Sequence, residues 1–187
     1  MSSTSSSATV IPTGTWSVDP AHSTVGFAVK HMGIANVRGQ FGEFQGTLEV
    51  GEDLSSATAF GTVKAASVDT SEPQRDDHLR SADFFDVAEH PEIRFQSTAI
   101  EPLDEDEFRI VGQLTIHGVT REIVLHAEVQ GTDVDPWGNE RVGLEVTGQL
   151  SRGDYGMQFN QMLGSGNVLV GDKVNLALDI SAVKQTS

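Results

Sequence analysis

Residues 105–129, EDEFRIVGQLTIHGVTREIVLHAEV, decide the fold because apolar and polar side chains alternate along almost the whole stretch. Every second residue from Phe108 to Ile116 is apolar or glycine, and the alternation resumes from Ile123 to Val129. A period of two is typical of antiparallel strands that keep one face in water. His117-Gly118 separates the two runs and predicts a two-residue hairpin loop, because glycine readily adopts a positive φ.

The same alternation recurs along the chain and predicts an all-β fold. Strands of ten or more residues exceed the usual five or six, and closing such a sheet into a barrel removes its exposed edges. An eight-stranded antiparallel barrel is wide enough for its own side chains or for one small ligand. We expect a short strand at 15–19 and eight long strands at about 22–31, 37–50, 57–68, 92–101, 107–117, 120–131, 141–152 and 173–183.

A helix is expected only where this alternation stops. Residues 71–74, SEPQ, offer an N-cap, a first-turn acid and proline, and a capping-box glutamine. We therefore expect a helix from Ser71 to about Arg80. Leu79 is the one large apolar residue on the side that also carries Arg75 and His78, so this helix must lean on the barrel.

The stretch RDDHLRSADFFDVAEHPEIRF, residues 75–95, places two adjacent phenylalanines in a polar loop. Phe84 and Phe85 gain little from that setting unless an apolar surface receives them. We expect a short helical lid segment near residues 71–86 over one mouth of the barrel. Replacing both rings with alanine should then weaken ligand retention more than it lowers the melting temperature.

Composition excludes several classes of function. The 187 residues include 12 Lys+Arg against 27 Asp+Glu, a net charge of -15, which argues against a nucleic-acid partner. The chain has no cysteine, and therefore no disulfide, thiol nucleophile or cysteine-ligated zinc. No apolar run approaches the roughly 18 residues of a spanning helix, so we expect a soluble protein without stable membrane insertion.

The N-terminal stretch MSSTSSSATVIPTG has no Lys or Arg and no long apolar run, so we read no secretory signal and expect a cytoplasmic location. Residues 1–13 are rich in Ser and Thr and are expected to form a disordered tail. Residues 14–187 show no internal repeat of 20 to 50 residues and are expected to form a single domain.

Motif searches give no catalytic set. No P-loop, HExxH, EF-hand or GxSxG pattern is present, and residues 164–169, GSGNVL, lack the third glycine of a dinucleotide fingerprint. No two of the six histidines form a close pair in sequence, so we predict structural or surface histidines and no metal site.

Four polar residues leave alternatives open. His31 is in phase with the apolar residues of its strand, so its imidazole should point inward, toward a ligand headgroup or an internal carboxylate. Arg75 and His78, with Arg80, either contact an anionic headgroup or pair with the adjacent aspartates.

Several motifs in order resemble the YceI-like polyisoprenoid-binding family, over about residues 14 to 183. The resemblance rests on WSVDPAHS (16–23), VGF (25–27), VKHM (29–32), VRGQF (37–41), FQG (44–46), the segment 75–95 with its DFFD, GQLTIHGVT (112–120), and Arg152 with DYG (154–156). It implies a lipocalin-like barrel of eight antiparallel strands with an elongated apolar cavity for a long isoprenoid or similar lipid. It implies no catalytic residue, and family analogy suggests a homodimer. Family members are often exported, and this chain departs from them in showing no signal.

The expected function is therefore binding, carriage or sequestration of a long-chain lipid, with no cofactor other than that ligand. Each buried CH₂ contributes about 0.8 kcal/mol, so a chain of about 40 carbons would nominally supply roughly 30 kcal/mol, more than the ceiling of about 18 to 21 kcal/mol for real affinities. Tight binding thus needs no strong polar contact. The candidate wall residues are Phe27, Val29, Phe41, Phe95, Leu114, Ile116, Leu176 and Leu178; the candidate mouth residues are Phe44, Leu79, Phe84, Phe85 and Met157, with His31, Arg75 and His78 as polar contacts.

Two alternatives stay open beside lipid carriage. A barrel filled by its own side chains would suit a stress-related, partner-binding protein. A lipid-modifying enzyme would need a nucleophile and base that the sequence does not reveal, so we predict no enzymatic activity. Added isoprenoids are expected to quench Trp16 or Trp137 if the barrel binds them.

Overall fold

The computed structural model describes residues 11–165 and 168–186. Most of the predicted tail over residues 1–13 lies outside this range. Its described part is packed against the barrel: Ile11 is fully buried, and the indole N–H of Trp16 donates to the Pro12 carbonyl at 2.9 Å. Residues 11–13 therefore belong structurally to the barrel end.

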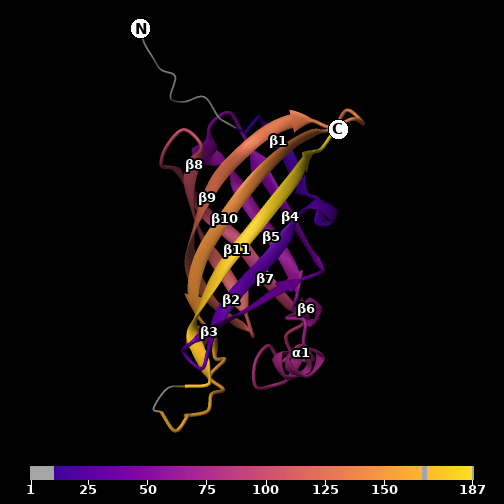
Figure 1. Ribbon diagram of the computed structural model, residues 1–187. Coiled ribbons are helices and arrows are strands. Elements are labelled where there is room, and N and C mark those ends of the chain that lie inside the picture. Colours follow the sequence, from indigo (N-terminus) through magenta and orange to yellow (C-terminus); the bar gives the residue numbers. More distant parts are fainter. Residues whose placement is uncertain (1–10, 166–167, 187) are drawn as a thin grey trace.

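The described chain is almost entirely β-structure (Figure 1). The only α-helix in that part is α1 (Pro73–Arg80). Short 3-10 turns lie between strands, as at η2 (Pro20–His22), η4 (Ala65–Ser67) and η5 (Arg152–Tyr155). The strands are β1 (Gly14–Val18), β2 (Thr24–His31), β3 (Ala35–Phe41), β4 (Phe44–Val50), β5 (Thr58–Lys64), β6 (Val68–Asp69), β7 (Glu92–Pro102), β8 (Glu107–Ile116), β9 (Val119–Val134), β10 (Glu140–Ser151) and β11 (Val170–Lys184).

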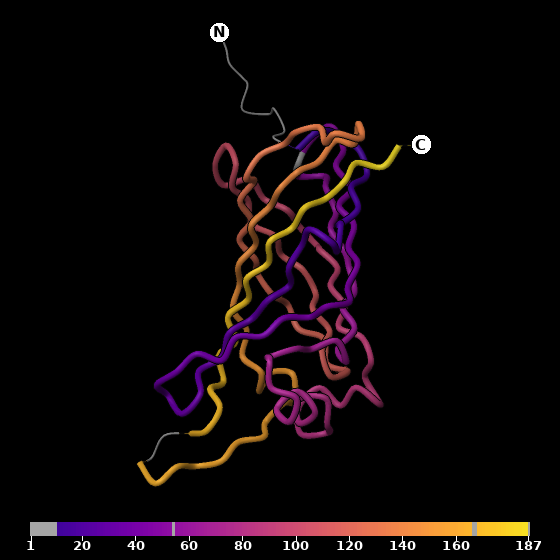
Figure 2. The backbone as a smooth tube through the Cα atoms, turned by 45° about the vertical axis from the view of Figure 1, so that its right-hand side comes forward, coloured from indigo at the N-terminus to yellow at the C-terminus, as the bar shows by residue number. Residues whose placement is uncertain are grey.

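Eight of these strands close into an antiparallel barrel, which confirms the predicted fold class. The ring runs β1-β4-β5-β7-β8-β9-β10-β11 and is completed by pairing of β11 with β1, where Val18 lies opposite Ala182. The prediction counted eight long strands and kept the short strand at 15–19 apart from them. In the structure that short strand, β1, is one of the eight strands of the ring. Figures 1 and 2 show the tall, tilted strands around a common axis.

The β8–β9 hairpin forms as its sequence predicts. Ile116 pairs with Val119, which leaves His117-Gly118 as the two-residue loop. Both loop residues have positive φ, 57° for His117 and 75° for Gly118, and two left-handed residues match the twist of the flanking strands.

The single strand predicted over 37–50 is wrong, because it is two strands, β3 and β4. Gly42 separates them, and its N–H donates to Ser67 O at 3.2 Å instead of joining a ladder. The inward-facing residues change parity at this point, from Phe41 to Phe44. This change shows that the chain turns between the two phenylalanines.

The strand predicted over 57–68 is also too long. β5 ends at Lys64, and η4 turns the chain so that the two-residue β6 pairs with the end of β3. Strands β2, β3 and β6 thus form a branch beside the lower part of β11. This branch widens the lower half of the barrel, below the short β1 (Figure 1).

The helix starts two residues later than predicted. Ser71 has a φ of 67°, and Glu72 is the N-cap, whose carboxylate accepts from the Gln74 N–H at 2.9 Å. Pro73 occupies the first helical position, where its missing N–H costs nothing. No helix in the described residues has the length and apolar character needed to cross a bilayer.

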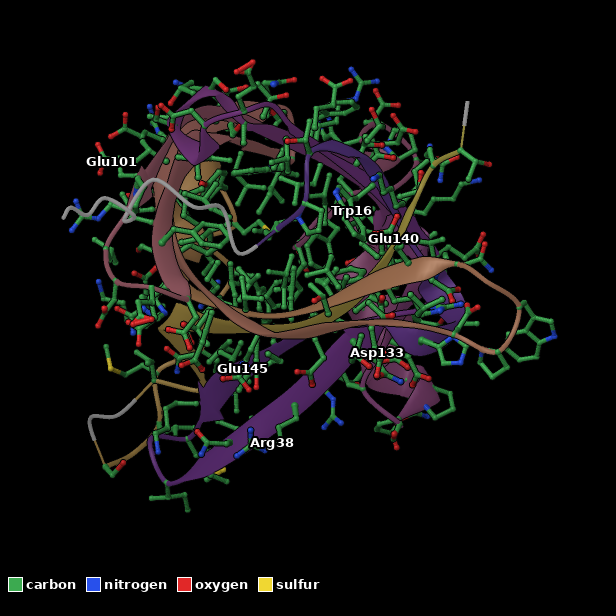
Figure 3. All side chains as sticks on the ribbon, turned by 90° about the horizontal axis from the view of Figure 1, so that it is seen from above. Trp16, Arg38, Glu101, Asp133, Glu140 and Glu145 are labelled. Carbon is green, nitrogen blue, oxygen red and sulfur yellow. The ribbon has the colours of Figure 1, made fainter. Side chains whose placement is uncertain are left out.

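One end of the barrel is tightly filled. Ile11, Trp16, Phe108 and Val142 are each at most 1% exposed and interlock beside the chain termini. Figure 3, viewed from this end, shows the Trp16 side chain within the ring of strands, whereas labelled acidic residues such as Glu101 and Glu145 lie on the outside. The interior is therefore closed at this end and must open, if anywhere, at the other.

Candidate binding cavity

The barrel encloses a cavity of about 720 Å³, lined from Phe108 and Ala182 near the closed end down to the lid segment. Its wall is built from the inward-facing residues of β2–β5 and β7–β11, and its lower end is bordered by the lid segment and by residues after η5. Every residue that the sequence assigned to wall or mouth lies on this lining; that these residues contact a ligand remains a prediction. They are Phe27, Val29 and His31 of β2, Phe41 of β3, Phe44 of β4, Phe95 of β7, Leu114 and Ile116 of β8, Leu176 and Leu178 of β11, Arg75, His78, Leu79, Phe84 and Phe85 of the lid, and Met157.

Strand β11 shows the change from filled core to cavity along a single element. Near the closed end its inward-facing Ala182 is 2% exposed. Farther down, Val174, Leu176 and Leu178 keep the same inward orientation but are only half-buried. Their remaining accessible surface faces the cavity, so these apolar side chains lack packing partners that a ligand could supply.

Two glycines make room for aromatic rings in the wall. A Cβ at Gly39 would stand 2.5 Å from Cζ of Phe27, and one at Gly112 would stand 2.5 Å from Cζ of Phe95. Both rings therefore lie against bare backbone. This packing holds the two rings at the wall rather than across the bore.

The two lid phenylalanines have different environments. Phe84 is 5% exposed and meets the rings of His78 and Phe159 edge-on, with centroids at 5.0 and 5.4 Å. Phe85 is half-buried and contacts Phe41 at 5.7 Å. Phe84 is therefore the anchor of the lid, and Phe85 is the ring that reaches into the barrel interior.

Arg152 organises the mouth, a role the sequence suggested only through its place in a family motif. The side chain is 5% exposed and donates to three carbonyls, those of Met157 (2.7 Å), Gly171 (2.9 Å) and Val170 (3.2 Å). Its guanidinium carbon lies 5.8 Å from the Phe84 ring centroid. Burial lowers the pKa of Arg152, and the nearby Asp172 carboxylate opposes that shift.

Phe159 is a second mouth residue that the sequence analysis missed. It lies in the loop between η5 and β11, and its ring is 4.8 Å from that of His78. The sequence did offer a signal: Phe159 is an aromatic residue in a polar, glycine-rich loop, and the same reasoning that singled out Phe84 and Phe85 applies to it.

Among the described residues Arg75 forms no ion pair with the adjacent aspartates, and its contact with an anionic headgroup remains a prediction. Its Nε donates to the Thr70 hydroxyl and its Nη2 to the Thr70 carbonyl, both at 2.7 Å. The Thr70 hydroxyl in turn donates to the buried Asp76 carboxylate at 2.5 Å. This arrangement fixes the start of the lid to β6 and occupies the polar groups of Thr70.

The neighbouring cations pair with aspartates, which was the simpler of the two predicted arrangements. Arg80 contacts Asp77 at 2.9 Å, and His78 Nε2 lies 2.8 Å from the Asp83 carboxylate. All four side chains are substantially exposed, so these pairs add little stability.

His31 is a polar wall residue whose imidazole has no hydrogen-bond partner among the described residues. It lies at the lower end of β2 and borders the cavity, as its strand phase predicted. Within the described residues its imidazole forms no hydrogen bond or ion pair, so neither an internal carboxylate nor a backbone group occupies it.

Neither tryptophan lines the cavity, so the predicted reporters are poorly placed. Trp16 belongs to the filled end, and Trp137 is 80% exposed on the turn between β9 and β10. A ligand in the lower half of the barrel would contact neither indole.

Comparisons with known proteins agree on the fold and on the sequence motifs. The YceI-like domain profile matches residues 16–182. Protein YceI of Escherichia coli O157:H7 is 36% identical over 165 residues, 88% of this chain and 83% of that protein. The crystal structure of Campylobacter jejuni YceI is 30% identical, with a TM-score of 0.71 over 84% of this chain and 90% of that one.

A more distant likeness shows the fold alone. A polyisoprenoid binding domain from Saccharophagus degradans, implicated in plant cell wall breakdown, is 15% identical, with a TM-score of 0.70. The alignment covers 91% of this chain and 98% of that domain.

Proposed function

This chain belongs to the YceI-like family, and from that premise we propose that it binds and carries, or sequesters, a long-chain isoprenoid or similar lipid inside the barrel. The observation that carries the proposal is the apolar cavity of about 720 Å³, within the usual range for small-molecule sites. The structural likeness to a polyisoprenoid binding domain supports the same ligand class.

The distribution of polar groups favours a mostly hydrocarbon ligand. The lower wall is made of half-buried apolar side chains such as Leu176 and Leu178, whose contacts are incomplete without a guest. His31 and Gln161 border the cavity at its lower part, where a small polar headgroup would meet them. The free energy of binding then comes chiefly from burying CH₂ groups, at about 0.8 kcal/mol each before ordering costs.

The lower end also suits entry of a lipid. The β2–β3 hairpin and the loop after η5 extend beyond the barrel there (Figure 2). They carry exposed apolar residues, among them Ile34 at 78% and Met162 at 70% exposure. An apolar rim beside an apolar cavity lowers the cost of moving a lipid tail through water.

The alternative of a filled barrel requires bulky side chains to fill the interior along its whole length. That holds only at the closed end, around Trp16 and Phe108. An enzyme acting on the lipid would need an activated nucleophile at the wall. The Thr70 hydroxyl is already engaged by Asp76 and Arg75, so it does not favour that alternative.

The test combines ligand identification with a matched pair of substitutions on β11. Protein purified without detergent should release a long-chain lipid into organic solvent, identified by mass spectrometry. Leu176→Trp adds bulk inside the cavity, whereas Ala177→Trp adds the same bulk to the outer face of the same strand. We expect the first variant to lose at least tenfold in bound lipid per folded molecule and the second to retain it.

The proposal fails if extracts of the wild type are consistently empty and added isoprenoids do not bind. It also fails if both tryptophan variants retain lipid equally. Phe85→Trp provides the mouth reporter that the native tryptophans do not, and isoprenoids should change its emission.

Other expectations from the sequence remain predictions. They are a homodimer, a cytoplasmic location, and the absence of a nucleic-acid partner. Light scattering on the purified chain measures the first directly.

A further inference from the structure

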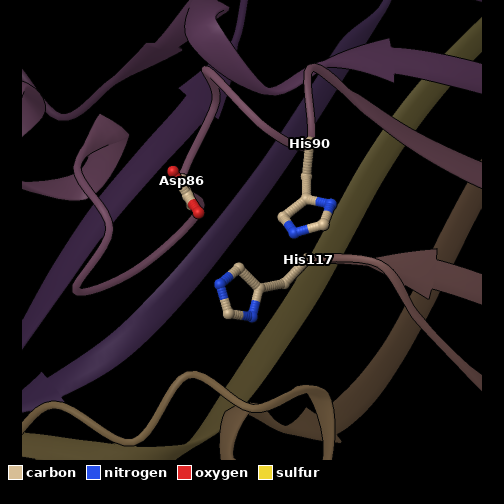
Figure 4. Close-up of side chains that lie close together, drawn as sticks. All are labelled: Asp86, His90 and His117. Carbon is tan, nitrogen blue, oxygen red and sulfur yellow. The ribbon is translucent and has the colours of Figure 1, made fainter.

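Three potential metal ligands meet outside the cavity, where the lid returns to the barrel. Asp86, His90 and His117 each offer a ligand atom within 4.8 Å of the other two (Figure 4). Asp86 and His90 belong to one turn, in which the His90 N–H donates to the Asp86 carbonyl at 2.8 Å. His117 comes from the β8–β9 hairpin loop, so the cluster joins two segments distant in sequence.

The His117 ring is fixed in the orientation that a metal ligand needs. Its Nδ1 lies 3.1 Å from the carbonyl oxygen of Tyr155. A carbonyl only accepts hydrogen bonds, so Nδ1 carries the hydrogen and Nε2 keeps its lone pair. Histidines that bind metals commonly use this arrangement, in which the second ring nitrogen donates to a backbone carbonyl.

His90 is held against the same hairpin. A Cβ at Gly118 would stand 2.7 Å from Cε1 of His90, so the ring occupies space that only glycine leaves free. The His90 and His117 rings lie 5.1 Å apart, inclined at 67°. The His90 imidazole, from the lid segment, therefore lies beside the His117 imidazole of the hairpin loop.

The Asp86 carboxylate and the His90 imidazole are both available to bind a ligand in the described structure. Among described residues, neither side chain forms a hydrogen bond or an ion pair, and none of the three residues lines the cavity. In a tetrahedral zinc site with bonds of about 2.1 Å, ligand atoms lie about 3.4 Å apart. The observed spacing therefore needs only small side-chain rotations to close around one ion.

We propose that Asp86, His90 and His117 bind one divalent transition-metal ion of the Zn²⁺ class, which fastens the lid to the β8–β9 hairpin. Two imidazoles and one carboxylate suit Zn²⁺, Co²⁺ or Ni²⁺ rather than Ca²⁺ or Mg²⁺. Asp86 directly follows Phe84–Phe85, so the ion would restrain the segment that carries the inner lid ring. The inference is independent of which ligand fills the barrel.

The test titrates tag-free, chelator-treated protein with ZnCl₂ by calorimetry and with CoCl₂ by visible absorption. The wild type should bind one ion per chain. Asp86→Asn, His90→Gln and His117→Asn should each weaken binding at least tenfold; asparagine suits positions 86 and 117 because it tolerates their positive φ. His22→Gln is the matched control, since His22 pairs with Asp19 but no third potential ligand joins them among the residues that the structure describes.

Loss of binding in the three site variants with retention in His22→Gln supports the site. No binding by the wild type, or binding that survives all three substitutions, overturns it. Melting of each variant in chelator shows whether it is folded, and a Co²⁺ spectrum for the wild type provides a readout that does not depend on the variants.

The fastening of the lid has its own readout. Hydrogen exchange over residues 81–90 should slow at least tenfold when Zn²⁺ is added to the wild type and should not change in Asp86→Asn. Metal binding without this protection would overturn the role in the lid.

Discussion

Phe84 and Phe85 are adjacent in sequence, yet they act on different parts of the molecule. Phe84 fills the aromatic cluster beneath Arg152, and Phe85 faces Phe41 inside the barrel. The expectation from sequence treated the pair as one lid, whose double replacement would affect retention more than stability. The two environments instead predict that Phe84 contributes mainly to stability and Phe85 mainly to lipid retention.

Phe84→Ala should lower the free energy of unfolding by about 3 to 5 kcal/mol, as for other buried phenylalanines. Phe85→Ala should cost clearly less but should raise the rate of lipid release severalfold. Urea denaturation measures the first effect, and transfer of lipid to acceptor vesicles, per folded molecule, measures the second. Equal release rates for Phe85→Ala and the wild type would show that Phe85 is only part of the core.

The Arg152 side chain donates hydrogen bonds to several backbone carbonyls at once. Arg152→Met keeps much of the apolar stem but removes the Arg152 donor from the carbonyls of Met157 and Gly171. The Val170 carbonyl keeps a second donor, the side-chain amide of Asn160 at 2.8 Å. We expect a loss of about 2 to 4 kcal/mol, since each buried unpaired acceptor costs about 1 to 3 kcal/mol and some will find water. Chemical denaturation gives the value.

Arg121→Met is the control for this substitution. Arg121 is exposed and donates to a single carbonyl, that of Asp154 at 3.1 Å. Its replacement should change stability by less than about 1 kcal/mol. Similar losses of stability in the two variants would mean that the buried hydrogen bonds of Arg152 contribute no more than the exposed one of Arg121.

At the scale of elements, the turn between β9 and β10 is stabilised by one carboxylate. Asp135 accepts from the Trp137 and Asn139 N–H groups and from Arg141 Nε at 2.8 Å. The hydrogen bond from Arg141, ahead of those from Asn139 and Trp137, lowers the pKa of Asp135 to about 2 from its ordinary 3.8. Arg141 also contacts Asp19, which ties the turn to the end of β1.

A depressed carboxylate pKa stabilises the fold above the unfolded value and loses that contribution as the pH falls through the folded one. The contribution of Asp135 should therefore be present above its ordinary 3.8 and vanish as the pH approaches about 2. Asp135→Asn should lower the urea midpoint near neutral pH, and its difference from the wild type should shrink across that window. A difference that does not depend on pH would contradict the assigned role of the charge.

The β3–β4 break shows what element-level sequence patterns can reveal. The interior positions change from odd to even numbers between Phe41 and Phe44, and such a change requires a turn or a bulge. The prediction of one strand over 37–50 overlooked it. The start of α1 was missed differently. Serine is a preferred N-cap residue, but Ser71 has a φ of 67°, and the structure places the N-cap at Glu72 instead.

For the whole molecule, the filled and hollow halves should differ in local stability. In lipid-free protein, amides of the hollow stretch of β11, around Val174 and Leu176, should exchange at least tenfold faster than those around Ala182. Bound lipid should slow exchange in the first group and leave the second nearly unchanged. Hydrogen exchange followed by mass spectrometry resolves the two groups, and uniform protection in both states would contradict looser packing of β11 away from the closed end.

The barrel and its inward-facing wall follow from the alternation in the sequence, because a period of two assigns each side chain to one face of a strand and closure turns one face inward. Features that depend on distances between remote segments could be known only from the folded molecule. Those features are the short β1 in the ring, the three carbonyls gathered by Arg152, and the meeting of Asp86 and His90 with His117. No local pattern encodes such encounters, since they follow from where the closed barrel brings its loops together.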